Sequence, residues 1–421
     1  MSTDHLKNWA GNLTYAAEKV CYPANVEELQ GMVTRWPSVR ALGTRHSFNE
    51  IADTSGVLIS LANLDPDIGI DSCAMTASVT GGTPFGVLIN GLQAHGFALH
   101  NTGSLPHISV AGAIATGTHG SGDSNGILST ALSAVEFVTA DGSRVTTDRA
   151  SEHFSAIAVG LGAFGVITRL FFDIQPTYMV RQDVYRYAPW EAVLERLDEV
   201  MASAYSVSLL ADFASPTVMQ IWLKTRLGEG EIREVAPTLF GATWYGDSEE
   251  VNLDNVNQRA SVPGPWSERM PHFRFEGVPS NAGDELQSEY YVARQHGVQA
   301  LEVLRALGPR IAPHLLIAEI RTAGADTLWL SPAYQRDILC IGFTWAKHPA
   351  EVGALLAVIE DALAPFEPRP HWGKLFHSGA DVIGPRFPRL DDFKAVRTHY
   401  DPHGKFWNPF LDHTLGEPTA H

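Results

Sequence analysis

The sequence predicts an α+β protein of two domains, and three observations support this fold class. The chain has 421 residues, which exceeds the usual size of a single hydrophobic core. Short strand and helix patterns are mixed in the first part, whereas longer strand-like runs dominate after Pro176. We therefore expect one domain at 1–176, a second with an antiparallel sheet at 177–375, and a C-terminal segment at 376–421.

The first region begins with a helix pattern and two short strand patterns. A helix is expected at 23–35, where Asn25 can cap the first turn and Glu28 can complete a capping box. Strands are expected at 39–42 and 57–61, which are short apolar runs. The first of these strands runs into a glycine-framed turn.

A second helix and a β-hairpin follow in the first region. Pro84 suits the first position of this helix, and Gly96 suits its end. The apolar run 135–140 meets Val145 across Asp141-Gly142, a typical hairpin turn. The first region is therefore expected to fold as one α+β unit.

The second region combines strand patterns with two helices. Helices are expected at 190–202 and 298–307, and strands at 206–213, 219–223, 315–322 and 338–345. A stretch with several prolines, 237–279, is expected to be rich in loops. The tail at 390–410 returns to a helix and a turn.

Composition narrows the classes of partner and compartment. The net charge is -17, which argues against nucleic acid and anionic membrane as partners. The three cysteines, Cys21, Cys73 and Cys340, are scattered and form no CxxC pair, which fits a reducing compartment. No signal peptide, membrane-spanning run or HxH or HExxH metal motif is present. We expect a soluble, cytoplasmic monomer without a bound metal.

Two loops rich in small residues stand out in the first third. Residues 43–49 read GTRHSFN, and residues 104–122 read SLPHISVAGAIATGTHGSG. Small residues let a backbone approach a ligand closely, and their amides and hydroxyls can surround a pyrophosphate. His46 is the one imidazole of the first loop and could act as a nucleophile toward a bound cofactor.

The segment 160–165 matches the dinucleotide fingerprint G-x-G-x-x-G. That motif has its meaning only between a strand and a helix. Here a strand-like run, 166–174, follows it, so we do not expect a Rossmann site. A loop packed near a cofactor is the better interpretation, and ordinary turn glycines are the alternative.

Glu319 and Arg321 lie two residues apart in an expected strand. Residues at that spacing point to the same face, so Leu316, Ala318 and Ile320 should pack on the other. From the residues alone, a structural salt bridge is at least as good an interpretation as a functional pair.

The motifs taken together resemble the FAD-linked oxidases of the vanillyl-alcohol-oxidase type, and most closely the alditol oxidases among them. The matching stretches are NWAGN at 8–12, the two loops, EIR at 319–321, RPHWGK at 369–374 and DPHGKF at 401–406 with Asn408. Their order and spacing cover nearly the whole chain. The resemblance implies a two-domain fold in which the C-terminal segment returns to the FAD-binding domain.

The resemblance also implies FAD attached covalently through one histidyl bond to His46. No cysteine lies in 104–122 to form a second bond. The Gly103 position, without a side chain, would leave room for dioxygen. The further implied cofactor contacts are Gly43, Thr44, Arg45, Ser47, Phe48, Gly103, Ser104, Ser109, Gly112, Thr116, Thr118, His119, Gly120, Gly165, Ile167, His371 and Asn408.

The resemblance implies catalytic roles for Arg321, Lys374 and Glu319. The two cations would stabilise the oxygen of the reacting alcohol, and Glu319 would accept hydrogen bonds from polyol hydroxyls. Ser104 and Thr344 would bind further hydroxyls. Without the motif, Lys374 would read as an ordinary solvated surface lysine.

The expected activity is the oxidation of a terminal alditol alcohol to the aldose, with reduction of dioxygen to hydrogen peroxide. Gly342 departs from the histidine usual in alditol oxidases and leaves a gap in the expected pocket. A sugar-lactone oxidase or dehydrogenase of the gulonolactone type is therefore the first alternative. A non-catalytic flavoprotein or sugar-binding protein is the second, and the presence of every polar pocket residue speaks against it.

Overall fold

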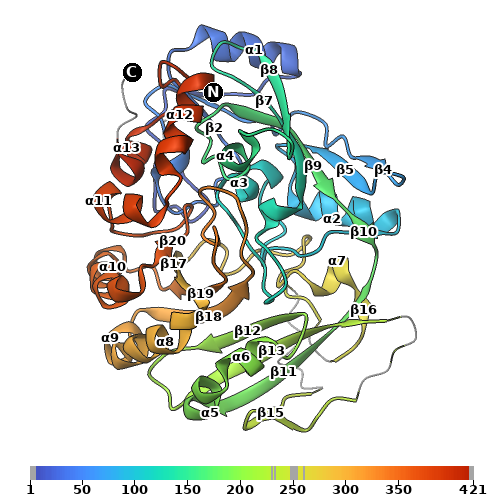
Figure 1. The fold of residues 1–421 in the computed structure, drawn as a ribbon, viewed down its shortest axis with the longest axis vertical. Helices are drawn as coiled ribbons and strands as arrows, with labels where there is room; N and C mark the ends of the chain where they lie inside the picture. The colour runs from blue at the N-terminus through green and yellow to red at the C-terminus, as the bar shows by residue number, and fades with distance from the viewer. Residues whose placement is uncertain (1–5, 229–230, 232–233, 247–254, 259–260, 417–421) are drawn as a thin grey trace.

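The computed structural model describes residues 6–228, 231, 234–246, 255–258 and 261–416, which form two main β-sheets with surrounding helices (Figure 1). Smaller sheets belong to the N-terminal region, coloured blue to green, and a ten-stranded sheet belongs to the middle of the chain. The C-terminal helices, coloured red, lie beside the N-terminal region.

A three-stranded parallel sheet opens the fold. Its strands in spatial order are β1 (Lys19–Cys21), β3 (Val57–Ile59) and β2 (Val39–Ala41). Helix α1 (Val26–Arg35) packs on it, and Oδ1 of Asn25 accepts the amide hydrogen of Glu28 at 2.8 Å. The Glu28 carboxylate accepts from the amide of Ala24, so the cap fixes the start of the helix.

An antiparallel sheet of five strands comes next. In spatial order these are β4 (Gly69–Asp71), β5 (Thr76–Thr80), β9 (Val166–Asp173), β7 (Leu132–Val138) and β8 (Arg144–Asp148). Three helices bury apolar side chains in the same core: α2 (Phe85–Ala94), α3 (Val110–Ala115) and α4 (Phe154–Ile157). A short pair, β6 (Phe97–Ala98) and β10 (Gln175–Pro176), leads into the second region.

The ten-stranded sheet is antiparallel throughout. Its main path runs β14 (Thr238–Leu239), β15 (Ala242–Trp244), β11 (Met179–Pro189), β13 (Thr217–Leu227), β12 (Ser206–Ala211), β18 (Leu315–Ala323), β19 (Ile338–Trp345), β17 (Leu286–Ala293) and β20 (Arg369–Pro370). Strand β16 (Gly264–Pro265) pairs with β11 off this path, and α7 (Trp266–Arg269) follows it.

Five helices cover one face of this sheet. They are α5 (Trp190–Glu195), α6 (Leu197–Met201), α8 (Gly297–Ala306), α9 (Gly308–Ile311) and α10 (Pro349–Leu363). Leu209, Ile320 and Ile341 are register partners and are buried in the core beneath these helices. Because side chains alternate along a strand, the residues next to them point to the opposite face. That face carries the polar residues described below.

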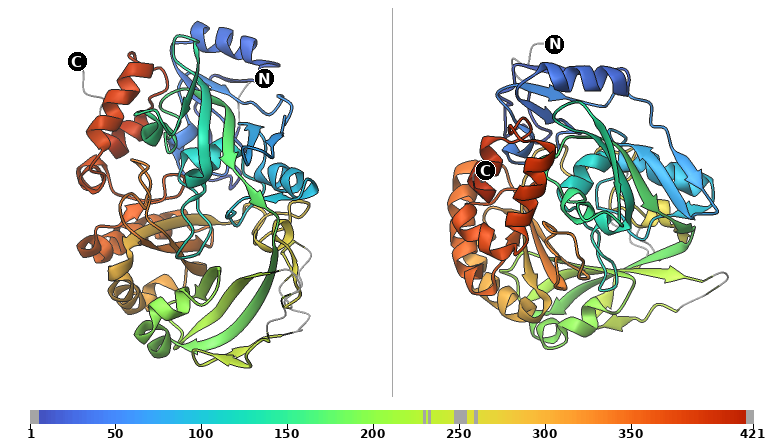
Figure 2. Two further views of the ribbon diagram at one scale, coloured as in Figure 1. Left: turned by 45° about the vertical axis from the view of Figure 1, so that its right-hand side comes forward. Right: turned by 45° about the horizontal axis from the view of Figure 1, so that its top comes forward.

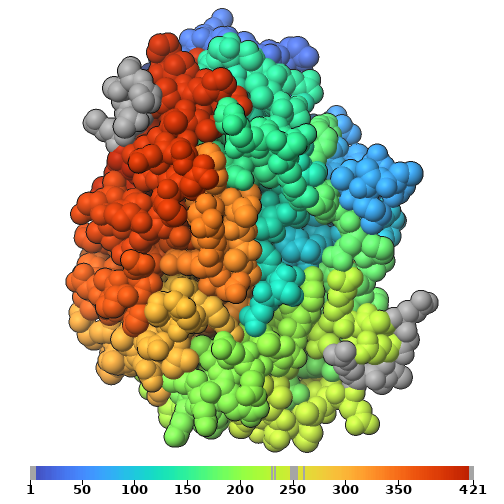
Figure 3. Space-filling model, viewed as in Figure 1, coloured from blue at the N-terminus to red at the C-terminus, as the bar shows by residue number. Residues whose placement is uncertain are grey.

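The C-terminal segment packs against the N-terminal region. It contains α11 (Ala380–Ile383), α12 (Leu390–Tyr400) and α13 (Pro409–Leu415). Phe393 meets Phe164 edge to face at 5.0 Å, and the amide of Val39 donates to the carbonyl of Lys405. The rotated views and the space-filling view show the red segment against the blue and teal parts (Figures 2 and 3).

Most expected elements of both regions are confirmed, and several details are wrong. The helix expected at 190–202 is broken into α5 and α6 at Arg196, whose φ of -126° is not helical. Helix α2 begins one residue late, because Pro84 is its N-cap. Within the expected loop 104–122, the Ala- and Ile-containing stretch forms helix α3.

Two further expectations need correction. Leu316 does not pack into the core but is 46% exposed, because a bulge between Leu315 and Ile317 shifts the strand register. The segment 237–279, expected as loops, contributes β14, β15, β16 and α7. Residues 247–254 and 259–260 of that segment lie outside the described residues.

Candidate active site

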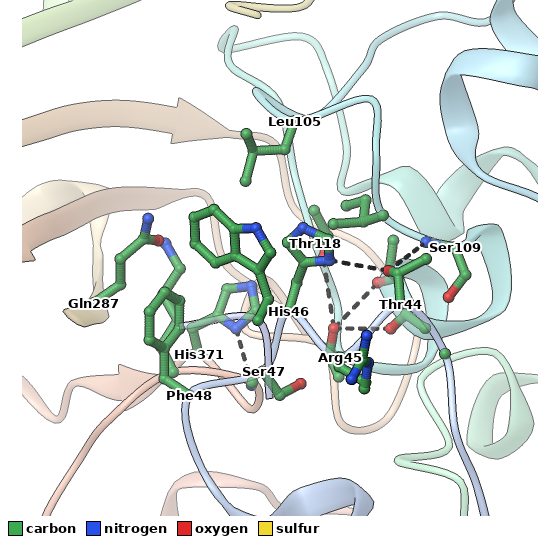
Figure 4. Close-up of a pocket in the computed structure, with 18 of the residues that line it drawn as sticks. Thr44, Arg45, His46, Ser47, Phe48, Leu105, Ser109, Thr118, Gln287 and His371 are labelled. Carbon is green, nitrogen blue, oxygen red and sulfur yellow. Dashed lines mark hydrogen bonds between the residues drawn. The ribbon is translucent and has the colours of Figure 1, made fainter. Parts of the chain in front are cut away.

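A cavity of about 500 Å³ lies between the polar face of the large sheet and the two small-residue loops. Its wall includes most of GTRHSFN, both ends of α3, and side chains from β17, β18 and β19. The close-up shows His46, Thr44 and Ser109 on one side and Gln287 and His371 on another (Figure 4). The cavity therefore joins the N-terminal region to the large sheet.

Thr44 connects the two loops. Its Oγ1 lies 3.0 Å from Nδ1 of His46 and accepts the amide hydrogen of Ser109 at 3.1 Å (Figure 4). Gly43 allows this approach, because a Cβ there would come within 2.4 Å of Oγ of Ser109. The glycine that frames the first loop is thus required by the contact between the loops.

His46 lines the cavity and has one ring nitrogen without a hydrogen bond to any described residue. Its Nε2 is buried and has no hydrogen-bond partner among the described residues. Burial lowers the pKa of His46 to about 4, and the nearby His107 contributes to this shift. The imidazole is therefore uncharged near neutral pH, which is the form that can act as a nucleophile.

The loop 160–165 also borders the cavity. Leu161, Gly162 and Gly165 line it, and β9 follows directly. The guanidinium of Arg40 holds the loop in place through the carbonyl oxygens of Leu161, at 2.8 Å, and Gly162, at 3.1 Å. The expectation of a loop near the ligand rather than a Rossmann turn agrees with this geometry.

Three adjacent strands place two carboxylates on the cavity face. Glu289 of β17 and Glu319 of β18 are both register partners of Gly342 on β19, which lies between them. A Cβ at Gly342 would meet Glu289 at 3.6 Å and the Glu319 carbonyl at 3.4 Å, which are ordinary contacts. Gly342 therefore leaves room for a Cβ between two acidic residues.

Arg321 and Lys374 supply the positive charge of the same face. Nη1 of Arg321 donates to Oγ of Ser104 at 3.2 Å, and Nζ of Lys374 donates to Oε2 of Glu289 at 2.6 Å. Burial lowers the pKa of Arg321, but Glu319 and Glu289 more than offset this and hold it above its ordinary value. The site thus keeps a buried guanidinium next to an ammonium group.

Glu319 and Arg321 form a loose ion pair without a hydrogen bond. Oε1 of Glu319 lies 3.7 Å from Nε of Arg321 and 3.5 Å from Nδ1 of His272. Both Oε1 of Glu319 and Nε of Arg321 are buried without a hydrogen-bond partner among the described residues. A buried polar atom without a hydrogen bond is costly, so the hydrogen-bonding capacity of these two atoms is not used within the described residues.

The amino-acid sequence of the chain is similar to that of a known oxidase. The chain is 42% identical over 408 residues to an alditol oxidase from Streptomyces sp. (strain IKD472 / FERM P-14339), covering 96% of this chain and 97% of that protein. The chain belongs to the alditol oxidase family of FAD-dependent oxidases, of the vanillyl-alcohol-oxidase type. It is an FAD-dependent oxidoreductase.

More distant similarities agree with this family. An FAD binding domain model matches residues 17–148, and a D-arabinono-1,4-lactone oxidase model matches residues 284–414. An L-gulono-1,4-lactone dehydrogenase from Mycobacterium tuberculosis is 26% identical, covering 97% of this chain and 98% of that protein. A cholesterol oxidase structure from B. sterolicum superposes with a TM-score of 0.78 at 14% identity, covering 97% of this chain and 96% of that one, and shows the fold alone.

The cavity residues fit the FAD that this family binds. Several glycines line the cavity, so backbone atoms form part of its wall. His46 adds a ring nitrogen, Nε2, that has no hydrogen-bond partner among the described residues. Most of the cofactor contacts expected from the sequence line the cavity: Gly43, Thr44, Arg45, His46, Ser47, Phe48, Ser104, Ser109, Gly112, Thr116, Thr118, His119, Gly165, Ile167 and His371. So do the expected substrate residues Glu319, Arg321, Thr344 and Lys374.

Three expected cofactor residues lie elsewhere. Gly103 and Gly120 are not part of the cavity wall, and a Cβ on them would point at Thr118 and at Asn101. Asn408 caps α13, and its Nδ2 donates to the carbonyl oxygens of Glu50, Ile51 and Asp53. Their described neighbours are other parts of the chain, and their assignment as cofactor contacts stays a prediction.

Several cavity residues had no assigned role from the sequence. Gly81 and Gly82 follow β5 and line the cavity, and Gln287 and Glu289 line it from β17. A glycine pair between a strand and a helix was a visible signal for the first two. For Glu289, the signal was one acidic residue in the strand-like run 286–293.

Two further properties of the described chain complete the site. In the described part of the chain, no three histidine, cysteine, aspartate or glutamate side chains are grouped so that they could hold a metal ion. Within the same residues, every helix is too short or too polar to cross a membrane.

Proposed function

We propose that this protein oxidises the terminal primary alcohol of alditols such as xylitol and sorbitol to the aldose, and that dioxygen is reduced to hydrogen peroxide. The observation that carries the proposal is the loose ion pair of Glu319 and Arg321 in a cavity that Lys374 also lines. Oε1 of Glu319 and Nε of Arg321 have no hydrogen-bond partner among the described residues. A carboxylate acceptor next to two cationic donors suits a ligand with several hydroxyl groups. The identity of 42% with an alditol oxidase supports the same assignment.

FAD would supply the acceptor for the hydride of the alcohol carbon and pass the electrons to dioxygen. We infer that it is bound through a single covalent bond to His46. The uncharged imidazole with a free Nε2 supports this bond, and Thr44 and Trp9 hold the ring. The glycines and hydroxyl residues of the two loops would surround the pyrophosphate.

The residues of the large sheet would bind the polyol. Arg321 and Lys374 would hold the oxygen of the reacting alcohol and stabilise its negative charge as hydride leaves the carbon. Glu319 would accept hydrogen bonds from the substrate, and Ser104 and Thr344 would contact hydroxyls farther along it. Arg321 is oriented for this role by its bond to Ser104.

A sugar-1,4-lactone is the second candidate substrate. The lactone oxidase model covers 284–414, the part that contains Glu289, Arg321 and Lys374. Gly342, which lacks the side chain usual in alditol oxidases, widens the cavity where such a ring could lie. Cytoplasmic location and a monomeric state stay predictions from composition.

Hydrogen peroxide release in air tests the proposal, with xylitol, sorbitol and gulonolactone compared at equal concentration. We expect release with the two polyols and little with the lactone. A preference for the lactone would move the assignment to the second candidate. If the protein with bound FAD releases no hydrogen peroxide with any of the three compounds, both candidate substrate classes are refuted.

A further inference from the structure

The buried carboxylate of Glu289 connects three basic side chains of the cavity. Its Oε2 accepts from Nζ of Lys374 at 2.6 Å, and its Oε1 lies 3.5 Å from Nη2 of Arg321. The Glu289 side chain is 1% exposed, so water does not screen it. The third basic group is His119, which comes from the second small-residue loop.

Both ring nitrogens of His119 face oxygen atoms. Nε2 lies 2.8 Å from Oε1 of Glu289, and Nδ1 lies 2.7 Å from the carbonyl oxygen of Gly120. A carbonyl oxygen only accepts, so one proton must lie on Nδ1. A second proton must lie between Nε2 and Oε1, because two bare acceptors would repel at that distance. Wherever that second proton resides, the ring and the carboxyl group together carry no net charge.

This shared proton changes the charge of the cavity. Without it, the carboxylates of Glu289 and Glu319 would balance the cations of Arg321 and Lys374, apart from Arg40 and Arg45, which line the cavity from the N-terminal region. With it, Glu289 is balanced by His119, and the remaining group of Glu319, Arg321 and Lys374 keeps one positive charge. We propose that His119 and Glu289 act as a neutral pair of positioning residues. Glu289 orients Lys374 through their hydrogen bond. His119 balances the charge of Glu289, so that Glu289 does not cancel the positive charge of Lys374. The excess charge favours an anionic oxygen beside the flavin, so the proposal rests on the proposed function.

Three neighbouring groups do not alter this balance. The Tyr291 ring meets the His119 ring edge to face, with the ring centroids 5.3 Å apart. Cys340 on β19 is the register partner of Tyr291. Burial raises the pKa of both side chains well above their ordinary values, so both are uncharged. Burial lowers the pKa of His371 to about 3, so this ring is also neutral near pH 7.

Sulfite binding to the FAD-loaded protein tests the proposal, because sulfite is an anion that adds reversibly to protein-bound flavin and bleaches its visible absorbance. The His119→Gln variant leaves the Glu289 charge unbalanced, so we expect sulfite affinity to fall by about tenfold or more. The Glu289→Gln variant removes charge and shared proton together, so its affinity should stay within about threefold of the wild type. The double variant, His119→Gln with Glu289→Gln, should recover the sulfite affinity that is lost in His119→Gln.

Two results would overturn the proposal. Sulfite affinity that rises about tenfold in Glu289→Gln would mean that Glu289 carries an unbalanced charge. A double variant that binds sulfite no better than His119→Gln would reduce His119 to a packing role. If His119→Gln does not fold, Glu289→Gln alone still distinguishes a balanced from an unbalanced carboxylate. Flavin absorbance of the wild type, measured first, tests FAD binding separately from the charge balance.

Discussion

The indole of Trp9 stacks on the imidazole of His46, with ring centroids 5.0 Å apart and an angle of 24° between the planes. The NWAGN segment also holds the His46 loop by its backbone. The Trp9 amide donates to the carbonyl of Arg45, and Asn8 and Asn12 donate to the carbonyls of Ser47 and Phe48. A motif remote in sequence therefore fixes the orientation of the proposed attachment site.

Replacing Trp9 with Ala should slow covalent attachment of FAD because the His46 ring loses its stacking partner. We expect an attachment rate lower by about tenfold, with FAD still bound noncovalently. Flavin fluorescence of the denatured protein after gel separation measures the covalent fraction over time. Trp36→Ala, which removes an indole that packs near Lys19, is the control. Equal attachment rates in the two variants would remove Trp9 from this role.

Attachment should tolerate mildly acidic conditions. Burial lowers the pKa of His46 from 6.5 to about 4, so the reactive uncharged ring persists as the pH falls through 6.5 and is lost only toward 4. The rate of covalent incorporation into apoprotein should therefore be constant from neutral pH to about 5. A midpoint near 6.5 would show that the ring is exposed to water during attachment.

The Gly342→His variant should fold and narrow the cavity. A Cβ there makes only ordinary contacts, and an imidazole would fill the space between Glu289 and Glu319. We expect kcat/KM for sorbitol to fall relative to xylitol, because the longer polyol needs that space. Gly31→His is the control, since nothing lies within 4 Å of its Cβ position. An unchanged ratio would show that substrates do not reach Gly342.

Asn408→Ala should destabilise the fold without changing the flavin site. The side chain caps α13 and donates to three carbonyl oxygens, so its loss should cost about 2 to 3 kcal/mol of unfolding free energy. Asn25→Ala, which removes the side-chain cap of α1, should cost about 1 kcal/mol. Denaturant unfolding compares the two. A cost no larger than that of the control, together with an altered flavin spectrum, would favour the predicted cofactor contact of Asn408 over a purely structural role.

The local parts of the fold could be predicted from the sequence because local signals determine them. Capping at Asn25 and the hairpin at Asp141-Gly142 are set by neighbouring residues. The strand between the G-x-G-x-x-G segment and Pro176 was also clear, which excluded a Rossmann site. The family motifs identified the two loops that meet at Thr44.

The long-range parts could not be predicted. Glu289 reaches the cavity because β17 pairs with β19, which brings Glu289 opposite Gly342. No local sequence pattern predicts that pairing. Gly103 and Asn408 belong to motifs that accompany FAD, yet their neighbours are other parts of the chain. Motif membership indicates that a residue matters, whereas only three-dimensional contacts separate ligand binding from support of the fold.

The decisive experiment for the proposed chemistry is the reduction of the flavin by xylitol without oxygen, followed in the wild type and in Lys374→Met. Lys374 lines the cavity with Arg321, and loss of its charge should slow reduction by at least about a hundredfold while FAD content stays equal. Lys19→Met on β1, outside the cavity wall, should be reduced at the wild-type rate. A Lys374→Met protein that is reduced as fast as the wild type would contradict the proposed oxidation of polyols at this site.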